Sequence, residues 1–280
     1  MIDRPENDNL SKIPVSVLVV TRNAAGMLRE CLNALTDFAE VLVIDSNSTD
    51  GTKHIATECG VRIISYQWNG RYPKKRQWSL DTLDLAHKWV FFVDADEVLT
   101  SNLVNEIRIL FLKEPASNAA GYFINGQYVW NGKTLNFGLR SRKIALLHRQ
   151  RMRFPEVDDL DCPGMGEIEG HYQPVPASPE YKISRLQSPL LHYGNRSPKE
   201  WQKRHEGYAA WESCMIKKHA WPQDPVAWRN VLKQLFRALP GRGPIAFLHS
   251  YVLKLGLLDG SAGYDFAKSR WRYYRMIKKI

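Results

Sequence analysis

The most informative segment for the fold of this chain is Val90-Phe91-Phe92-Val93-Asp94-Ala95-Asp96-Glu97. Its four consecutive apolar residues predict a strand that is buried on both faces, and the acidic residues follow directly. Asp94 and Asp96 stand on alternate residues, so both carboxylates can approach one divalent cation. Mg²⁺ and Mn²⁺ prefer oxygen ligands and commonly share them with phosphate oxygens. An isolated acidic pair is usually a solvated turn, so its meaning depends on the sequence around it.

The residues before and after this stretch alternate between strand and helix patterns. Strands are predicted at 15–20, 41–44, 61–66 and 89–93. Helices are predicted at 25–35, from a cap within 48–50 through 59, at 73–86 and at 101–112. Such alternation indicates an α/β fold, a mostly parallel Rossmann-like sheet flanked by helices and joined by right-handed crossovers. Ligands of these sheets bind outside the carboxyl ends of the strands. That rule groups Thr21, Asn23 and Asp45 with the acidic pair.

The rest of the chain changes character twice. Residues 118–195 mix aromatic and polar residues, which predicts antiparallel strands and, at 155–170, an acidic loop. From residue 198 onward the pattern is helical and basic, with a break at 240–244. We therefore predict a catalytic domain over 1–197, divided into a donor-binding half (1–117) and an acceptor-side half (118–197), and a helical region over 198–280.

The charge distribution predicts an anionic surface partner. The net charge is +10, yet residues 1–198 are balanced and the whole excess lies in residues 199–280. Residues 268–280 interleave Lys and Arg with Trp, Tyr, Met and Ile, a pattern typical of a helix in a membrane interface. A helix packed on the domain with a solvated basic face is the alternative.

The expected location is the cytoplasm, with peripheral contact on the inner face of the plasma membrane. The N-terminal residues show no secretory signal, and no apolar run is long enough to span a bilayer. The four cysteines, Cys31, Cys59, Cys162 and Cys214, are scattered, which predicts reduced thiols that serve in packing.

A basic cluster follows the third predicted strand. Arg76 is the residue that we expect to contact a diphosphate, whereas Lys74 and Lys75 fit a solvated face equally well.

Four segments together resemble a known family. Residues 17–23 (VLVVTRN), 43–52 (VIDSNSTDGT), 75–78 (KRQW) and 94–97 (DADE) are similar to the inverting family-2 glycosyltransferases of GT-A fold, in the branch that assembles lipopolysaccharide core and exopolysaccharide. Leu257-Leu258-Asp259-Gly260 resembles the same branch.

The resemblance implies transfer of a sugar from a nucleotide-sugar donor, with uridine as the expected nucleotide, to a lipid-linked or surface-glycan acceptor. It also implies a divalent metal, Mn²⁺ or Mg²⁺. In the family's pattern Asp45 binds the nucleobase, Asp94 the ribose or the metal, and Asp96 the metal. Thr21, Asn23 and Arg76 complete the expected donor site.

An inverting transferase needs a general base for the acceptor hydroxyl. The resemblance places a carboxylate downstream of the acidic pair. Glu167 matches that placement, Glu169 is the alternative, and both could be structural. A late histidine often reaches the metal in such enzymes; His192 is the expected one and His171 another candidate.

Two other functions compete with this interpretation. A nucleotidyltransferase also combines paired aspartates with a Rossmann-like sheet, but its Gly-rich basic loop is not found after the first strand, at 21–26. A nucleic-acid-binding protein would explain the basic, aromatic C-terminal region. The sheet region is neutral and no nucleic-acid motif occurs, so we expect no nucleic-acid partner.

Overall fold

The computed structural model describes residues 12–169, 172–194 and 198–277. The first half contains β1 (Ile13–Thr21), α1 (Leu28–Asn33), β2 (Phe38–Asp45), α2 (Thr52–Glu58), β3 (Arg62–Ser65), α3 (Lys75–Thr82), β4 (Trp89–Asp94), β5 (Glu97–Leu99), α4 (Ser101–Leu112) and β6 (Ala119–Trp130). The second half contains β7 (Lys133–Thr134), β8 (Ser141–His148), β9 (Met152–Arg153), β10 (Val175–Pro176), β11 (Lys182–Arg185), β12 (Leu190–His192), α5 (Pro198–Lys218), α6 (Ala227–Ala238), α7 (Arg242–Leu248), the π-helix η1 (His249–Leu253), the 3-10 helix η2 (Gly256–Asp259) and α8 (Ser261–Met276).

One large sheet forms the centre of the molecule. Its strand order is β3-β2-β1-β4-β8-β6-β12-β5, with β7 and β11 also paired to β6. β1 to β4 are mutually parallel, β8 runs antiparallel between β4 and β6, and β12 and β11 run parallel to β6. The predicted α/β fold with a mostly parallel sheet is confirmed. The expectation that all strands of 118–195 would be antiparallel is wrong for β11 and β12.

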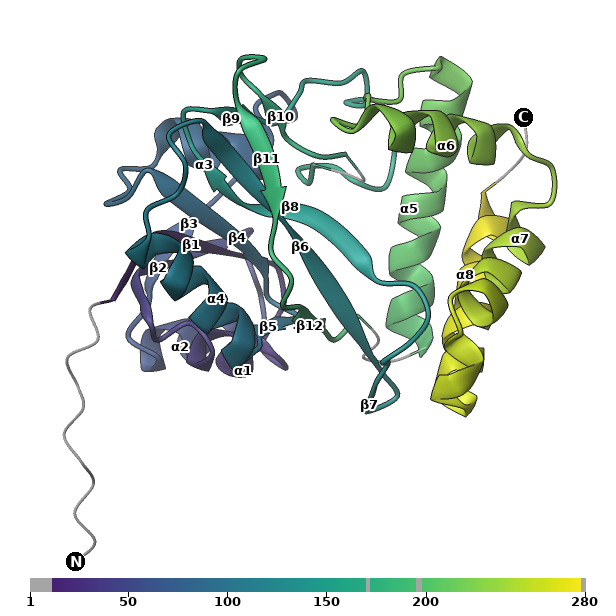
Figure 1. Cartoon of the computed structure of the whole chain (residues 1–280), viewed down its shortest axis with the longest axis horizontal. Helices are drawn as coiled ribbons and strands as arrows, with labels where there is room; N and C mark the ends of the chain where they lie inside the picture. Colours follow the sequence, from purple (N-terminus) through teal and green to yellow (C-terminus); the bar gives the residue numbers. More distant parts are fainter. Residues whose placement is uncertain (1–11, 170–171, 195–197, 278–280) are drawn as a thin grey trace, which may run out of the picture.

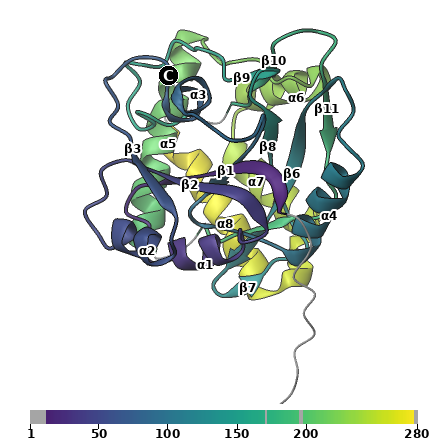
Figure 2. The ribbon, with the colours of Figure 1, turned by 90° about the vertical axis from the view of Figure 1, so that its left-hand side faces the viewer.

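Both faces of the sheet are covered, which explains the uninterrupted apolar strands (Figure 2). Val17 and Val19 face one core together with α1, α2 and α4. Leu18 faces the other core, where Leu80 of α3 and Phe154 pack. Side chains alternate along a strand, so a strand buried on both sides must be apolar at every position.

The C-terminal helices gather beside β6 and β8 (Figure 1). Trp130 of β6, Trp201 of α5 and Phe266 of α8 share a small core, and α8 also packs on α7. The helical pattern predicted from residue 198 is confirmed, although α7 already begins at Arg242. None of the helices in the described ranges is long and apolar enough to cross a bilayer.

The third helix is shorter than predicted. The sequence predicts 73–86, whereas α3 spans Lys75–Thr82, with Lys74 extended at its N-cap. Lys74, which precedes the helix, takes part in a buried ion pair described below.

Candidate active site

The carboxyl ends of β1, β2 and β4 meet at one edge of the sheet. The register pairs Thr21 with Asp45, and Val20 with Asp94. Parallel neighbours end on the same side, so polar residues from three separate parts of the chain come together there.

Asp94 is held between two cations. Arg76 donates from Nη2 to Asp94 Oδ1 at 2.7 Å, and Lys143 donates from Nζ to Asp94 Oδ2 at 2.8 Å. The positive charges of Lys143 and Arg76 outweigh burial and hold the pKa of Asp94 well below its usual range. Arg76 is thus held at this edge of the sheet, and its contact with a diphosphate stays a prediction. Lys143 was not foreseen, because its position opposite Asp94 depends on the pairing of β4 with β8.

Asp96 and His192 come together through the pairing of β5 with β12. His192 lies opposite Glu97 in that ladder, and the Tyr193 amide donates to the Asp96 carbonyl at 2.8 Å. His192 Nε2 lies 3.9 Å from Asp96 Oδ2, and Arg204 of α5 donates to the same oxygen at 3.2 Å. The predicted proximity of His192 to the acidic pair is observed, and Arg204 is an additional contact that the sequence did not indicate.

The chemistry of these donors fits a divalent cation in part. Asp96 and His192 offer an oxygen and a nitrogen that could be shared with donor phosphates, and a protein often supplies Mg²⁺ with only one or two carboxylates. Both oxygens of Asp94 are bound to Arg76 and Lys143. Among the residues whose placement is described, no group of three or more His, Cys, Asp or Glu forms a metal cluster. Asp96 and His192 are thus the better fit, and Asp94 as a ligand stays a prediction. His171 lies outside the described residues.

Asp45 is fully buried and organises the turn after β2. It accepts hydrogen bonds from Thr21 Oγ1 at 3.1 Å and from the Ser48 amide at 3.0 Å. Asn23 has φ +51° and accepts from the Thr49 amide at 2.9 Å, which ties the turn after β1 to the same loop. Nucleobase binding by Asp45 stays a prediction; in this structure its carboxylate shapes the loop.

Glu167 and Glu169 have different surroundings. Glu167 Oε1 lies 3.2 Å from Lys75 Nζ, and its side chain is 13% exposed. Glu169 is buried; its Oε1 accepts from the Gln77 amide in the first turn of α3 at 2.9 Å, and burial raises its pKa. Its Oε2 has no hydrogen-bond partner in the described parts of the chain. Glu169 therefore caps α3, whereas Glu167 is more open to a substrate.

Lys74 and Lys75 do not form a solvated face. Both are buried, because each has a carboxylate partner: Lys75 pairs with Glu167, and Lys74 Nζ lies 2.7 Å from Asp159 Oδ2. The alternative of a solvated basic face is therefore wrong at these two positions.

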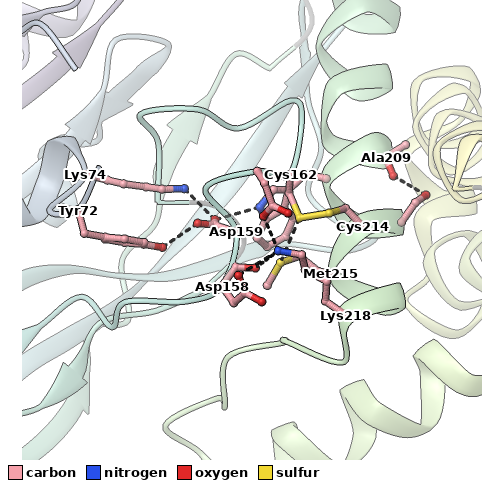
Figure 3. Close-up of a disulfide and its surroundings, with 12 residues drawn as sticks. Tyr72, Lys74, Asp158, Asp159, Cys162, Ala209, Cys214, Met215 and Lys218 are labelled. Carbon is pink, nitrogen blue, oxygen red and sulfur yellow. Dashed lines mark hydrogen bonds and ion pairs between the residues drawn. A yellow bond between two sulfur atoms is a disulfide. The ribbon is translucent and has the colours of Figure 1, made fainter. Parts of the chain in front are cut away.

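The 155–169 loop, which carries both glutamates, is fastened to α5 (Figure 3). Asp159 accepts from Tyr72 at 2.8 Å and from Trp211 of α5 at 3.0 Å, in addition to Lys74. A disulfide joins Cys162 of this loop to Cys214 of α5. The prediction of four reduced cysteines is wrong for this pair, whose members are 52 residues apart in sequence. Cys31 and Cys59 are free.

A cavity of about 990 Å³ lies at this edge of the sheet. Thr21, Asn23, Arg76, Asp94, Asp96, Glu167, Glu169 and His192 line it, together with side chains of α5, α6 and α8. Of the predicted site residues, Asp45 is the exception, because it lies behind this surface. The cavity is large enough for a sugar donor and part of an acceptor.

The segment of the chain that contains this edge matches a known family. Residues 16–172 match Glycosyl transferase family 2. The chain belongs to this family. The resemblance noted in the sequence is thereby confirmed, and the nucleotidyltransferase alternative loses its support.

Two curated relatives are partial matches. An uncharacterized glycosyltransferase of Rickettsia typhi is 28% identical over 143 residues, 50% of this chain and 48% of the relative. The lipopolysaccharide core biosynthesis glycosyltransferase LpsC of Rhizobium meliloti is 31% identical over 99 residues, 34% of this chain and 36% of LpsC. The matched regions thus span about half the length of these relatives or less.

A solved structure supports the fold. The mannosyltransferase PcManGT of Pyrobaculum calidifontis, in complex with GDP-Man and Mn²⁺, aligns with a TM-score of 0.50 at 16% identity, covering 95% of this chain and 86% of that chain. At this identity the likeness concerns the GT-A fold.

Proposed function

We propose that this chain transfers a sugar from a nucleoside-diphosphate donor to a glycan acceptor by a single inverting displacement. The observation that carries the proposal is the Asp94-Ala95-Asp96 edge, where Arg76 and His192 converge in a cavity within a family-2 chain. We expect a uridine nucleotide, on the resemblance of the sequence motifs. PcManGT was solved with GDP-Man, so guanosine sugars belong in the same test.

The proposed reaction is a single displacement at C1 of the donor sugar, assisted by a general base. An acceptor hydroxyl oxygen would form the new bond to C1 of the donor sugar while the bond from C1 to the diphosphate oxygen breaks. The diphosphate would leave with the electron pair, and the hydroxyl proton would pass to a carboxylate. We assign that base to Glu167, since it is the more exposed carboxylate of the two and its Oε1 lies 3.2 Å from Lys75 Nζ at the cavity wall.

Charge on the leaving diphosphate would be met by Arg76 and by a divalent cation. Asp96 and His192 would hold the cation, and Mn²⁺ or Mg²⁺ would supply electrostatic stabilisation of the departing diphosphate. Arg76 is positioned for this task by its ion pair with Asp94 and by a hydrogen bond to the Glu169 carbonyl at 3.4 Å.

A donor panel tests the reaction. Purified protein with Mn²⁺ is incubated with UDP- and GDP-sugars, and release of nucleoside diphosphate is measured with and without glycan acceptors. We expect turnover with one nucleotide class and a product of inverted anomeric configuration by NMR. A retained anomer would reject the single displacement.

We also propose a lipid-linked or surface-glycan acceptor, reached by peripheral contact with an anionic bilayer. Support comes from α6, whose outward face is apolar: Trp228, Val231, Leu232 and Leu235 are 54–62% exposed. Further exposed apolar residues follow in η1 and η2. Amphipathic helices of this kind lie in membrane interfaces, and the positive excess of residues 199–280 complements anionic lipid.

The exposed apolar residues of α6, η1 and η2 make these elements the expected membrane contact, in place of residues 268–280. In α8, Phe266 and Ala267 are buried, and Tyr273 and Tyr274 line the cavity, so most of its aromatic residues are used in packing. Residues 278–280 lie outside the described chain.

Sedimentation with vesicles tests the contact. Binding should require phosphatidylglycerol, weaken with salt, and fall strongly in the double variant Trp228→Ser/Leu235→Ser. Removal of residues 268–280 should have the smaller effect. If the double variant instead abolishes a dimer seen by sedimentation velocity and leaves vesicle binding unchanged, α6 serves a second copy of the chain and the membrane proposal fails.

A further inference from the structure

Helix α6 turns its cationic face toward the cavity. Arg229, Lys233 and Arg237 follow one another at four-residue spacing, on one side of the helix, and all three line the cavity. Trp228, Val231, Leu232 and Leu235 occupy the outward face, whereas Phe236 lines the cavity beside the cations. A surface helix of a globular protein has the reverse orientation, with its apolar face inward. The inward placement of three cations therefore indicates a charged occupant of the cavity.

Aromatic rings hold two of these guanidinium groups. The Arg229 guanidinium lies 5.2 Å from the Phe123 ring centre, and that of Arg237 lies 3.6 Å from the ring centre of Trp221. Stacking fixes a guanidinium plane while its edge N–H groups stay available for an oxyanion. The arginines are thus restrained before a ligand arrives, which lowers the entropic cost of binding.

A fourth cation joins them from the sheet. Arg142 of β8 lines the same cavity and donates from Nε to Asn125 Oδ1 at 3.2 Å. Burial, followed by the charges of Arg185 and Arg229, lowers the pKa of Arg142 below its usual value. Like charges have therefore been brought close together here, at a cost in free energy that an anion would relieve.

The nearby carboxylates balance only part of this charge. Asp224 lies 2.7 Å from Lys233 Nζ and 3.5 Å from Arg229 Nη2. Glu212 is used by Arg242, at 2.8 Å, and by the Tyr273 hydroxyl. Arg229 Nη1 is buried and has no hydrogen-bond partner in the ranges that the structure covers. A buried guanidinium donor without an acceptor is destabilising, so a ligand oxygen is the missing partner.

We propose that Arg142 and Arg229, with Lys233 beside them, form a subsite for a phosphate group carried by the acceptor. The inference rests on the proposed function, because it names the class of acceptor that the same cavity takes. These three cations face the single carboxylate of Asp224, and the excess of two positive charges suits a group of charge near −2, which arginine binds through two oxygens at once. The diphosphate of the donor is expected elsewhere, at Arg76 and the cation that Asp96 and His192 would hold, so this wall of α6 and β8 is left for the acceptor.

The test uses the full chain and a soluble probe. Binding of glucose 6-phosphate and of glucose is measured by NMR titration, both without nucleotide and with nucleoside diphosphate and Mn²⁺ at saturation. We expect the phosphorylated sugar to bind at least about tenfold more tightly than glucose. Arg142→Gln and Arg229→Gln should each weaken it about tenfold, as expected for a charge-assisted hydrogen bond. Arg272→Gln, an exposed residue of α8 with the same change of charge, should leave it unchanged.

Three results would overturn the inference. Glucose 6-phosphate could bind no better than glucose, or Arg272→Gln could weaken it as much as the cavity variants do. Alternatively, the cavity variants could lose only binding to phosphatidylglycerol vesicles, which would assign the cluster to lipid headgroups. Nucleoside diphosphate binding is recorded in the same samples. Its absence would count against the proposed function, while the sugar-phosphate titration without nucleotide still decides this inference.

Discussion

Asp159→Asn is the perturbation that probes how the 155–169 loop is held in place. Asp159 and Lys74 form an ion pair of 2.7 Å whose side chains are 0% and 1% exposed. The substitution removes the negative charge and leaves the Lys74 ammonium buried without a counter-charge. Breaking a buried pair from one side costs about 3–5 kcal/mol. For a chain of this length that lowers the melting temperature by roughly 6–10 °C.

The magnitude is measured by urea denaturation followed by tryptophan fluorescence, under non-reducing conditions. Asp158→Asn is the matched control, since the neighbouring side chain is 74% exposed and pairs with Lys218 at the surface. It should cost less than about 1 kcal/mol. The double variant Lys74→Met/Asp159→Asn removes the orphaned charge and should recover most of the lost stability. If the destabilisations by Lys74→Met and by Asp159→Asn simply add in the double variant, the buried pair does not hold this loop in place. The same follows if Asp159→Asn costs no more free energy of unfolding than Asp158→Asn.

Three further predictions concern the same half of the molecule. Glu167→Gln should lower turnover by roughly 10² or more with unchanged donor binding. Glu169→Gln keeps an oxygen that accepts from the Gln77 amide, so it should retain turnover and should not lower the melting temperature at pH 8. The opposite pattern in acceptor-dependent kinetics would assign the base to Glu169. Cys162→Ser opens the bond to Cys214 and should lower the free energy of unfolding by roughly 4 kcal/mol on the loop-entropy account, and equal denaturation midpoints with and without reductant would contradict this. Burial lowers the pKa of His148 to about 4, so the unfolded state takes up the proton first as the pH falls. The free energy of unfolding should therefore drop by up to about 3 kcal/mol between pH 6.5 and 4. His148→Gln should remove most of this pH dependence, and an unchanged pH dependence in the variant would show that other groups cause it.

The parts of the site that follow from local sequence were predictable. An apolar run followed by Asp94 and Asp96 fixes a strand and its carboxyl end, and alternation of elements fixes the neighbours of that strand. Thr21 and Asp94 therefore reach one edge whatever the details of the loops.

The parts that depend on non-local pairing were not predictable. Lys143 contacts Asp94 because β8 pairs with β4, and Arg204 reaches Asp96 from a helix more than 100 residues later. Burial of Lys74 depends on Asp159, far along the chain, and no local pattern indicates it. The disulfide likewise links Cys162 to a helix whose docking the sequence does not specify.

Metal-assisted transfer at the Asp94-Ala95-Asp96 edge requires the carboxylate of Asp96, so its removal is the decisive experiment. Release of nucleoside diphosphate from the best donor of the panel, with Mn²⁺, is compared between the unaltered chain, Asp96→Asn and the control Asp37→Asn. The Asp37 side chain is 53% exposed and forms an ion pair with Arg108, away from the cavity. We predict a loss of at least about 10² in turnover for Asp96→Asn, since electrostatic stabilisation of the leaving group is worth several kcal/mol, and an unchanged rate for the control. Equal turnover in Asp96→Asn and the unaltered chain would contradict the account.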